Sequence, residues 1–259
     1  PLLGFGDCRC RSGRFDLAVG RGDSSMRVMG KKPATLKRVA EFIDKTKAMV
    51  RGEEVTYGEI PAPVKFPWAV GHDMPSWIAA YGPLALKTAG EHAEGVVLQI
   101  ADPGLCKWFT DQCIDAGKAA GKDMSGFRSM AAAPAYFGEK KRAIEHVKWF
   151  PAMVGNHVAD IVEKYGADSN KVPSSLTSYI EKRRGYDYSK HGQADNPYLD
   201  FITDDVVESF CVLGEPEDHI KKLHELEAAG VTQFNIYLDS GDEEDIIARY
   251  GREVIPAFR

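Results

Sequence analysis

The chain has 259 residues, enough for one large domain or two small ones, and 44% of them are hydrophobic and 27% charged. Its 33 lysines and arginines against 38 aspartates and glutamates give a formal net charge of −5. This mildly acidic balance, with no basic stripe, argues against a nucleic-acid-binding protein. The composition is that of an ordinary globular protein and not of a disordered one.

The sequence gives no sign of a membrane segment or of disulfide bonds. No apolar run reaches the ~18 residues that a membrane span needs, and Asp7 and Arg9 stand where a signal peptide would be apolar. The five cysteines are an odd number without regular spacing, and Cys106 and Cys113 fall in a helical pattern as packed thiols would. We therefore expect a cytoplasmic protein that stays out of the membrane.

Strands and helices alternate along most of the chain. In the first half of the chain the pattern predicts strand 14–19, turn 20–25, helix 35–52 with Thr35 as N-cap, a proline-rich connection at 58–75, strand 76–81, helix 83–92, strand 95–100 and helix 105–120. In the second half it predicts strand 127–136, helix 139–165, strand 210–213, a cap at 214–217 followed by a helix to 229, strand 232–238 and helix 243–258. Nearly continuous apolar strands separated by helices indicate a parallel sheet in an α/β fold. The pattern alone leaves a doubly wound sheet and a (β/α) barrel both open.

One segment, at 167–204, interrupts this alternation. It contains a helical patch at 174–184 and is rich in tyrosine and glycine near Tyr186 and Tyr188. An insert of this size between regular units is usually a lid or binding loop, or a disordered segment.

The turns that follow the strands are the places to look for a site, because parallel α/β folds bind ligands at the carboxyl ends of their strands. The turn after the first strand reads GRGDS at 20–24, and Ser25 stands where a dinucleotide fingerprint would have its third glycine. Asp23 or Ser24 could simply cap the following helix there. Alternatively, Asp23 is a carboxylate at the mouth of a pocket that exchanges a proton or fixes a polar group.

The next two strands end in different kinds of residue. The turn at 79–83 has small residues that would let a flat ring or a phosphate approach the backbone, although close packing of strand on helix would need them too. The third strand ends in Gln99 and Ile100. The seven histidines form no metal-binding spacing, so no metal site is predicted, and no G-x-S-x-G elbow supplies a hydrolase nucleophile.

Several segments together resemble the luciferase-like monooxygenase family. They are SGRFDLAVGRGDS at 12–24, WIAAYGP at 77–83, AGEHAEGVVL at 89–98, GEPE at 214–217 and YGREVIP at 250–256. The second and third segments are similar to a family block with an A-A-x-G-P turn, an alanine-rich helix and A-G-x-x-A-D-G. Their order is that of the family, and the match spreads over the chain from Ser12 to Arg259.

The resemblance implies a TIM-like (β/α)₈ barrel of the bacterial luciferase type, formed by 1–259 as a single domain with the insert at 167–204. If 14–19 is the fourth barrel strand, three βα units, or roughly 90 residues, would precede it. We therefore expect an N-terminally truncated barrel with about five of its eight strands, as the start at Pro1 also suggests. The family further implies a homodimer.

The family binds FMN or the deazaflavin coenzyme F-420, and GRGDS followed by KKPAT at 31–35 is more similar to the members that use F-420. By the same resemblance Asp23 is the candidate catalytic residue, near the ring and the substrate. The candidate cofactor-binding residues are Gly20, Gly22, Ala79, Ala80, Tyr81, Gly82, Gln99 and Ile100.

The expected activity is that of an oxidoreductase in which a reduced deazaflavin or flavin exchanges a hydride with a small organic substrate. An FMN-dependent monooxygenase that uses molecular oxygen is the second possibility. A non-catalytic barrel fragment or binding protein is the third.

Overall fold

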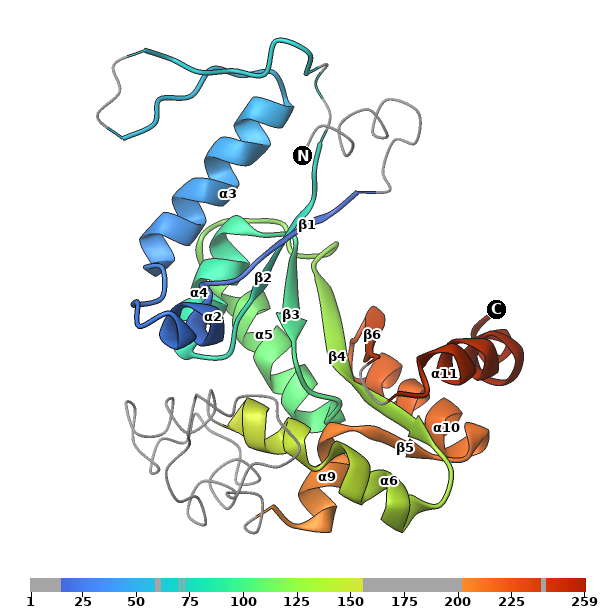
Figure 1. The fold of residues 1–259 in the computed structure, drawn as a ribbon. Helices are drawn as coiled ribbons and strands as arrows, with labels where there is room; N and C mark the ends of the chain where they lie inside the picture. The colour runs from blue at the N-terminus through green and yellow to red at the C-terminus, as the bar shows by residue number, and fades with distance from the viewer. Residues whose placement is uncertain (1–14, 59–61, 70, 72, 156–201, 239–240) are drawn as a thin grey trace. The chain divides into compact units, whose positions relative to one another are not determined.

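The computed structural model describes residues 15–58, 62–69, 71, 73–155, 202–238 and 241–259 (Figure 1). Contacts between Cα atoms group the chain into two compact units. Unit 1 comprises the described residues within 1–80, 84–96 and 112–127, and unit 2 those within 81–83, 97–111 and 128–259. The predicted insert at 167–204 lies almost wholly outside the described residues.

All six predicted strands are present, which confirms a parallel α/β fold. They are β1 (Leu17–Val19), β2 (Ser76–Ala79), β3 (Gly95–Leu98), β4 (Arg128–Phe137), β5 (Val212–Gly214) and β6 (Gln233–Tyr237). Hydrogen bonding joins them in the order β1-β2-β3-β4-β5, and β6 also pairs with β4. The pairs β1–β2, β4–β5 and β4–β6 are parallel.

In unit 1 the chain leaves β1 through a glycine turn into two helices. Gly22 has a φ of 74° and serves as N-cap of α2 (Asp23–Val28), where the sequence predicted only a turn. The second helix, α3 (Leu36–Val50), begins as predicted: the backbone N–H of Arg38 donates to Oγ1 of Thr35 at 3.2 Å.

Two glycines of unit 1 allow neighbouring elements to approach closely. A Cβ atom on Gly95, the first residue of β3, would lie 2.6 Å from Cδ2 of Trp77 in β2. A Cβ atom on Gly90, in α4 (Pro83–His92), would lie 2.9 Å from the backbone nitrogen of Gly117 in α5 (Pro103–Ala119). Any larger residue at these positions would push the elements apart.

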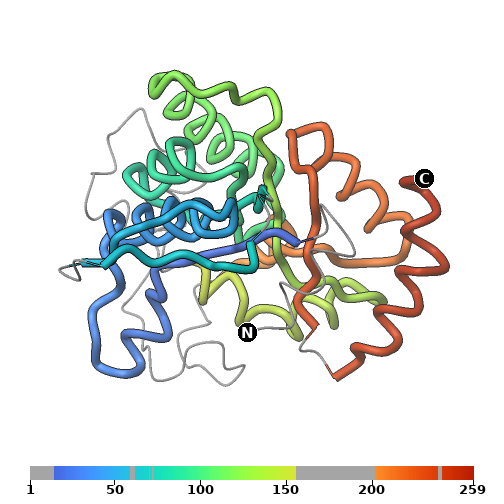
Figure 2. Tube along the Cα trace, turned by 90° about the horizontal axis from the view of Figure 1, so that it is seen from above, coloured from blue at the N-terminus to red at the C-terminus, as the bar shows by residue number. Residues whose placement is uncertain are grey.

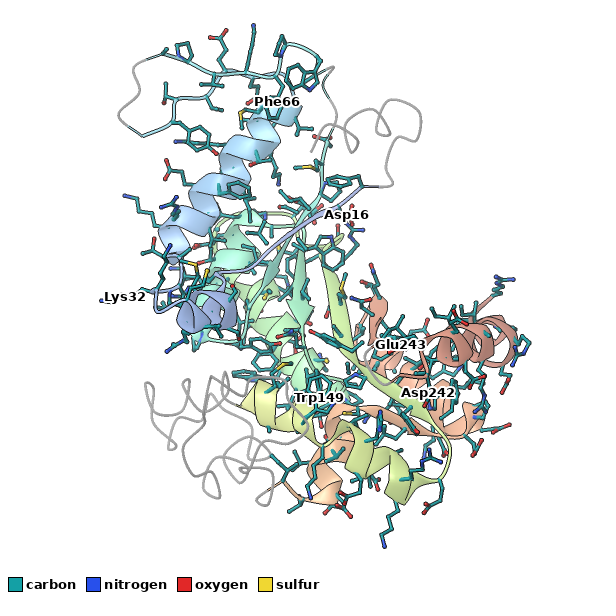
Figure 3. All side chains as sticks on the ribbon, in the orientation of Figure 1. Asp16, Lys32, Phe66, Trp149, Asp242 and Glu243 are labelled. Carbon is teal, nitrogen blue, oxygen red and sulfur yellow. The ribbon has the colours of Figure 1, made fainter. Side chains whose placement is uncertain are left out.

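The edge of the sheet in unit 1 is fixed by side chains from neighbouring elements. The indole Nε1 of Trp77 donates to Oδ2 of Asp16 at 2.9 Å. Asp16 lies just before β1 and is labelled in Figure 3. Glu94 accepts from the backbone N–H of Ser76 at 2.9 Å and pairs with Lys47 of α3 at 2.5 Å. Burial opposes ionisation of Glu94, but the hydrogen bonds from Lys47 and Ser76 outweigh it and lower the pKa of the carboxyl group.

In unit 2 the ten-residue strand β4 pairs with two different strands. Met130 to Pro134 pair with β6, and Ala135 to Phe137 pair with β5. Figure 2 follows the chain from β4 to the last helices, which it draws in orange and red. Four of the residues in the middle of β4 are alanines, and all of them are buried.

The helices of unit 2 depart from the prediction in two places. The helix predicted at 139–165 is interrupted: α6 (Lys140–Val147) ends before a turn residue, Lys148, and helical structure resumes over 149–155. The helix α9 (Asp204–Phe210) was missed, because its seven residues are too few to show a helical period.

The C-terminal helices agree better with the sequence. Glu215 and Asp218 form a capping box at the start of α10 (Pro216–Ala228), and Gly230 follows the end of that helix with a φ of 92°. The last predicted helix consists of α11 (Glu243–Arg249), a π-helical turn at Tyr250–Val254 and a 3₁₀ turn at Ile255–Phe258.

The cysteines of the described residues are free and buried: Cys106, Cys113 and Cys211. Burial raises the pKa of the Cys113 thiol to about 12 and that of Cys106 further, so both stay protonated. The prediction of packed thiols is confirmed for Cys106 and Cys113. Among the described helices, none has the length and apolar character needed to cross a membrane.

Candidate active site

Unit 1 brings two predicted cofactor-binding residues side by side. Val19 of β1 pairs with Ile78 of β2, so the residues that follow, Gly20 and Ala79, lie side by side at the end of the two strands. A Cβ atom built on Gly20 would lie 3.7 Å from Cβ of Ala79, an ordinary contact distance. The missing side chain of Gly20 therefore leaves an exposed, narrow stretch of backbone at the carboxyl end of this strand pair.

Asp23, the candidate catalytic residue, is the first residue of α2, with its side chain 30% exposed. Oδ1 of Asp23 lies 3.9 Å from Nη1 of Arg21, whose Nε donates to the carbonyl of Ala34 at 2.8 Å. The interpretation of Asp23 or Ser24 as a helix cap is wrong, because Gly22 is the N-cap and no side chain caps this helix. The partly exposed carboxylate thus has a neighbouring positive charge just after a strand end.

Unit 2 brings together two other predicted residues, Tyr81 and Gln99. The backbone N–H of Gln99 donates to the phenol oxygen of Tyr81 at 2.5 Å, and the Tyr81 hydroxyl donates to Oε1 of Gln99 at 3.2 Å. Removal from water raises the pKa of Tyr81 well above that of a free phenol, so the hydroxyl stays a donor at neutral pH.

Tyr237 joins this pair and was not predicted as a site residue. Nε2 of Gln99 donates to the phenol oxygen of Tyr237, the last residue of β6. The sequence did contain a usable signal, because Tyr237 is the last residue but one of the predicted strand 232–238 and so falls near the strand end where ligands bind in a parallel sheet. The three side chains are half-buried.

Aromatic rings hold the two phenols in place. The ring of Tyr81 meets Phe109 edge-on, with centroids 5.9 Å apart, and the ring of Tyr237 lies 5.5 Å from that of Phe150. Phe150 in turn packs edge-on against Trp149, labelled in Figure 3. Such contacts restrict the orientation of each ring and so the position of its hydroxyl oxygen.

The remaining predicted cofactor-binding residues could contact a ligand mostly through their backbone atoms. Ile100 is completely buried and Ala80 is 2% exposed, so neither side chain is available to a ligand. Gly82 is half-buried in the bend before α4.

Asp102, two residues beyond Ile100, has a structural role. Its Oδ1 accepts from the backbone N–H of Leu105 at 2.7 Å, and Oδ2 accepts from the Ser209 hydroxyl. The carboxylate thereby caps α5 and ties it to α9. Within the described residues no cluster of three or more histidine, cysteine, aspartate or glutamate side chains could hold a metal ion.

Comparison with known proteins identifies the family. The family model described as luciferase-like monooxygenase matches residues 10–233. The chain belongs to the luciferase-like monooxygenase family. Among curated proteins, a 5,10-methylenetetrahydromethanopterin reductase of Methanopyrus kandleri is 31% identical over 193 residues, which are 73% of this chain and 52% of that protein. The chain therefore spans about half the length of this relative.

Two solved structures show the luciferase-like fold. The coenzyme F-420-dependent tetrahydromethanopterin reductase from Methanopyrus kandleri superposes with a TM-score of 0.62 and 23% identity, covering 96% of this chain and 75% of that one. An F-420-dependent secondary alcohol dehydrogenase in complex with an F-420–acetone adduct gives a TM-score of 0.66 and 19% identity, covering 97% and 72%. The predicted fold class, a TIM-like α/β fold of the luciferase type, is confirmed.

Proposed function

We propose that this luciferase-like protein is an oxidoreductase that exchanges a hydride between coenzyme F-420, or a flavin, and a small organic substrate. The observation that carries the proposal is its 31% identity over 193 residues to a protein named 5,10-methylenetetrahydromethanopterin reductase. The two structures with the same fold are also named as F-420-dependent enzymes. Because the chain spans only part of each of these proteins, its activity has to be measured on the chain itself.

The residues at the strand ends fit such a ring. Tyr81, Gln99 and Tyr237 offer neutral donors and acceptors, which suit the carbonyl and amide edge of a flat heterocycle. The exposed backbone at Gly20 beside Ala79 suits the close approach of a cofactor chain. Both features support the proposal independently of the family.

In the proposed reaction the redox ring supplies the hydride chemistry, and the protein supplies orientation and electrostatics. Asp23 would act as the catalytic residue, fixing a polar group of the substrate or holding its proton. Gly20, Gly22, Ala79, Ala80 and Gly82 would present backbone to the cofactor, and Tyr81 and Gln99 would present side chains. Ile100 would take part through its backbone.

Titration of the purified chain with F-420 and with FMN, followed by ring fluorescence, tests the proposal. Saturable binding of F-420 supports the hydride-transfer reaction. Binding of FMN with substrate-dependent oxygen consumption would instead favour a monooxygenase, because a deazaflavin has carbon where a flavin binds oxygen. Failure to bind either compound would refute the proposal and favour a non-catalytic barrel fragment.

We also propose a homodimer in the cytoplasm, as the family resemblance and the buried free thiols suggest. Sedimentation equilibrium would test the dimer: a single species with the mass of one chain would contradict it.

A further inference from the structure

A short basic segment follows the first strand of unit 1. Residues 21–38 contain six lysines and arginines and one aspartate, a net charge of +5 in a chain whose net charge is −5. Four of the basic side chains are exposed and form no ion pair with a described residue: Lys31, Lys32, Lys37 and Arg38. We call these four residues the basic patch; Lys32 is labelled in Figure 3, beside α2.

The basic patch lies at the carboxyl end of β1. Lys31 and Lys32 belong to the connection that leads from α2 to α3, and Lys37 and Arg38 are in the first turn of α3. A chain that leaves a parallel strand makes this connection at the edge of the sheet where ligands bind. The exposed backbone at Gly20 lies at the same edge, directly after β1.

Hydrogen bonds fix the backbone that carries Lys31. The helix α2 ends in a Schellman motif, in which the N–H of Gly30 donates to the carbonyl of Arg27 at 2.9 Å and the N–H of Lys31 donates to the carbonyl of Met26 at 2.8 Å. Gly30 has a φ of 66°, which this motif requires. The direction in which the chain leaves α2 is therefore set by the helix end.

The same connection is tied back to the end of β1. The N–H of Ala34 donates to the carbonyl of Arg21 at 3.0 Å, and Nε of Arg21 donates to the carbonyl of Ala34 at 2.8 Å. Arg21 also faces Asp23, so its charge already has a partner and it is not counted in the basic patch. These bonds hold the basic segment next to Gly20, although its lysine side chains are exposed.

The nearest acidic side chain of α3 does not neutralise the basic patch. Lys45, 2.5 Å from Glu41, is the main cause that lowers the pKa of this carboxyl group, and Lys37 and Arg38 add to the shift. Glu41 therefore has a closer partner than the patch. A group of cations without an ion pair favours an anion from outside the chain.

We propose that the basic patch binds the anionic chain of the cofactor through its phosphate or carboxylate groups. The inference rests on the proposed function. F-420 carries a phosphate and carboxylates beyond its ribityl chain, and FMN ends in a phosphate; ammonium and guanidinium groups bind both kinds of anion by charge-assisted hydrogen bonds. The exposed backbone at Gly20 lets such a chain pass close to the strand end on its way to the patch.

Paired ligands isolate the contribution of the anionic chain. F-420 is compared with the deazaflavin that has the ribityl chain alone, and FMN is compared with riboflavin, by fluorescence titration of the purified chain. The wild type should bind the anionic member of a pair about 10-fold more tightly or better at about 20 mM salt. This preference should shrink at about 500 mM salt, because exposed charges are screened.

Replacing two of the four cations tests the basic patch itself. Lys31→Gln with Lys32→Gln should weaken F-420 binding by about 3- to 10-fold at low salt and leave the affinity for the ribityl deazaflavin unchanged. Lys31→Arg with Lys32→Arg keeps both charges and should keep the affinity. The matched control is Lys65→Gln with Lys118→Gln, which removes the same charge from two exposed lysines of unit 1, in the connection before β2 and in the last turn of α5.

Each result of this comparison decides the proposal. A loss for the anionic ligand alone, found in Lys31→Gln with Lys32→Gln but not in the control, supports it. An equal loss for both ligands of a pair, or in both double variants, would overturn it. A wild type that binds both members of each pair equally well would also overturn it and leave the proposed function standing. A wild type that binds none of the four ligands would refute the proposed function, and this inference with it. Thermal unfolding shows whether each variant remains folded.

Discussion

His219 makes the stability of unit 2 depend on pH. The side chain is completely buried in α10, with Nδ1 3.0 Å from the Tyr250 hydroxyl and Nε2 3.3 Å from the carbonyl of Tyr136. Its ring stacks on Phe137 at 4.1 Å, with the planes 8° apart. A neutral imidazole satisfies both partners, because Nε2–H donates to the carbonyl and Nδ1 accepts from the phenol.

The surroundings of His219 disfavour its charged form. Burial is the main cause that lowers its pKa from 6.5 to about 4, and the guanidinium of Arg249, over the Phe137 ring, adds to it. The Tyr136 carbonyl, Asp218 and the Gly214 backbone oppose this shift without cancelling it.

Because the unfolded chain binds this proton at a higher pH than the folded chain, folding stability falls as the pH falls. The loss begins near pH 6.5, reaches about 2 kcal/mol at pH 5 and levels off at about 3 kcal/mol below pH 4.

Urea unfolding between about pH 7.5 and pH 4.5, followed by circular dichroism, measures this loss. His219→Gln removes the titrating group, so its unfolding free energy should decline less over this range than that of the wild type, by about 2 kcal/mol. The control is His224→Gln on the same helix, where the side chain is half-exposed beside Glu227. This variant keeps His219 and its buried contacts, so the loss of stability attributed to His219 should remain. If the wild type and His219→Gln lose stability in parallel, the reasoning about burial is refuted.

Three further changes have definite expected outcomes. Gly95→Ala places a methyl group against the Trp77 ring and should lower the free energy of unfolding by about 1–3 kcal/mol in urea unfolding. Gly126→Ala, where a Cβ atom would have no neighbour within 4 Å, should lower it little. Equal effects of the two variants would contradict the packing argument. Glu94→Gln should lower the free energy of unfolding by about 1 kcal/mol at neutral pH. Because the pKa of Glu94 is lowered in the folded chain, this difference should shrink as acid protonates the wild-type carboxylate. A difference that does not change with pH would argue against the ion pair. Asp23→Ala should reduce turnover in steady-state assays while cofactor affinity is mostly kept, and unchanged turnover would remove Asp23 from the mechanism.

The regular elements could be predicted because their apolar residues recur over several turns or fill a whole strand. The helix α4 begins at Pro83 and ends at His92, as predicted, since proline and the following strand mark its ends. Short elements escaped: α2 has six residues, and its glycine N-cap resembles a plain turn. The break at Lys148 was overlooked, although Pro151 signals it: a proline has no N–H to donate to the carbonyl of Val147, four residues earlier, where α6 ends.

The sequence could identify candidate site residues only for one strand at a time. A strand end identifies Tyr81 and Gln99 as candidates, but a single sequence does not say which side chains from different strands will meet. The contact between Gln99 and Tyr237 joins residues 138 apart in the sequence, so it depends on the three-dimensional fold. Likewise, the completely buried Ile100 was proposed from its position, while its burial depends on distant parts of the chain.

The block that most resembles the family is explained largely by packing. In AGEHAEG at 89–95, Gly90 leaves room for α5 and Gly95 leaves room for the Trp77 ring. Glu94 bonds both to Ser76 at the start of β2 and to Lys47 of α3. These contacts would be needed in this fold whatever the ligand, so the block indicates the family and says little about the reaction. The chemistry must be sought where packing does not require the residue. A half-buried tyrosine, glutamine and second tyrosine at three strand ends are not needed to close a hydrophobic core, since burying polar groups only costs free energy unless they are paired. Their pairing with one another removes that cost, and under the proposed function this edge of the sheet is where we expect the cofactor ring.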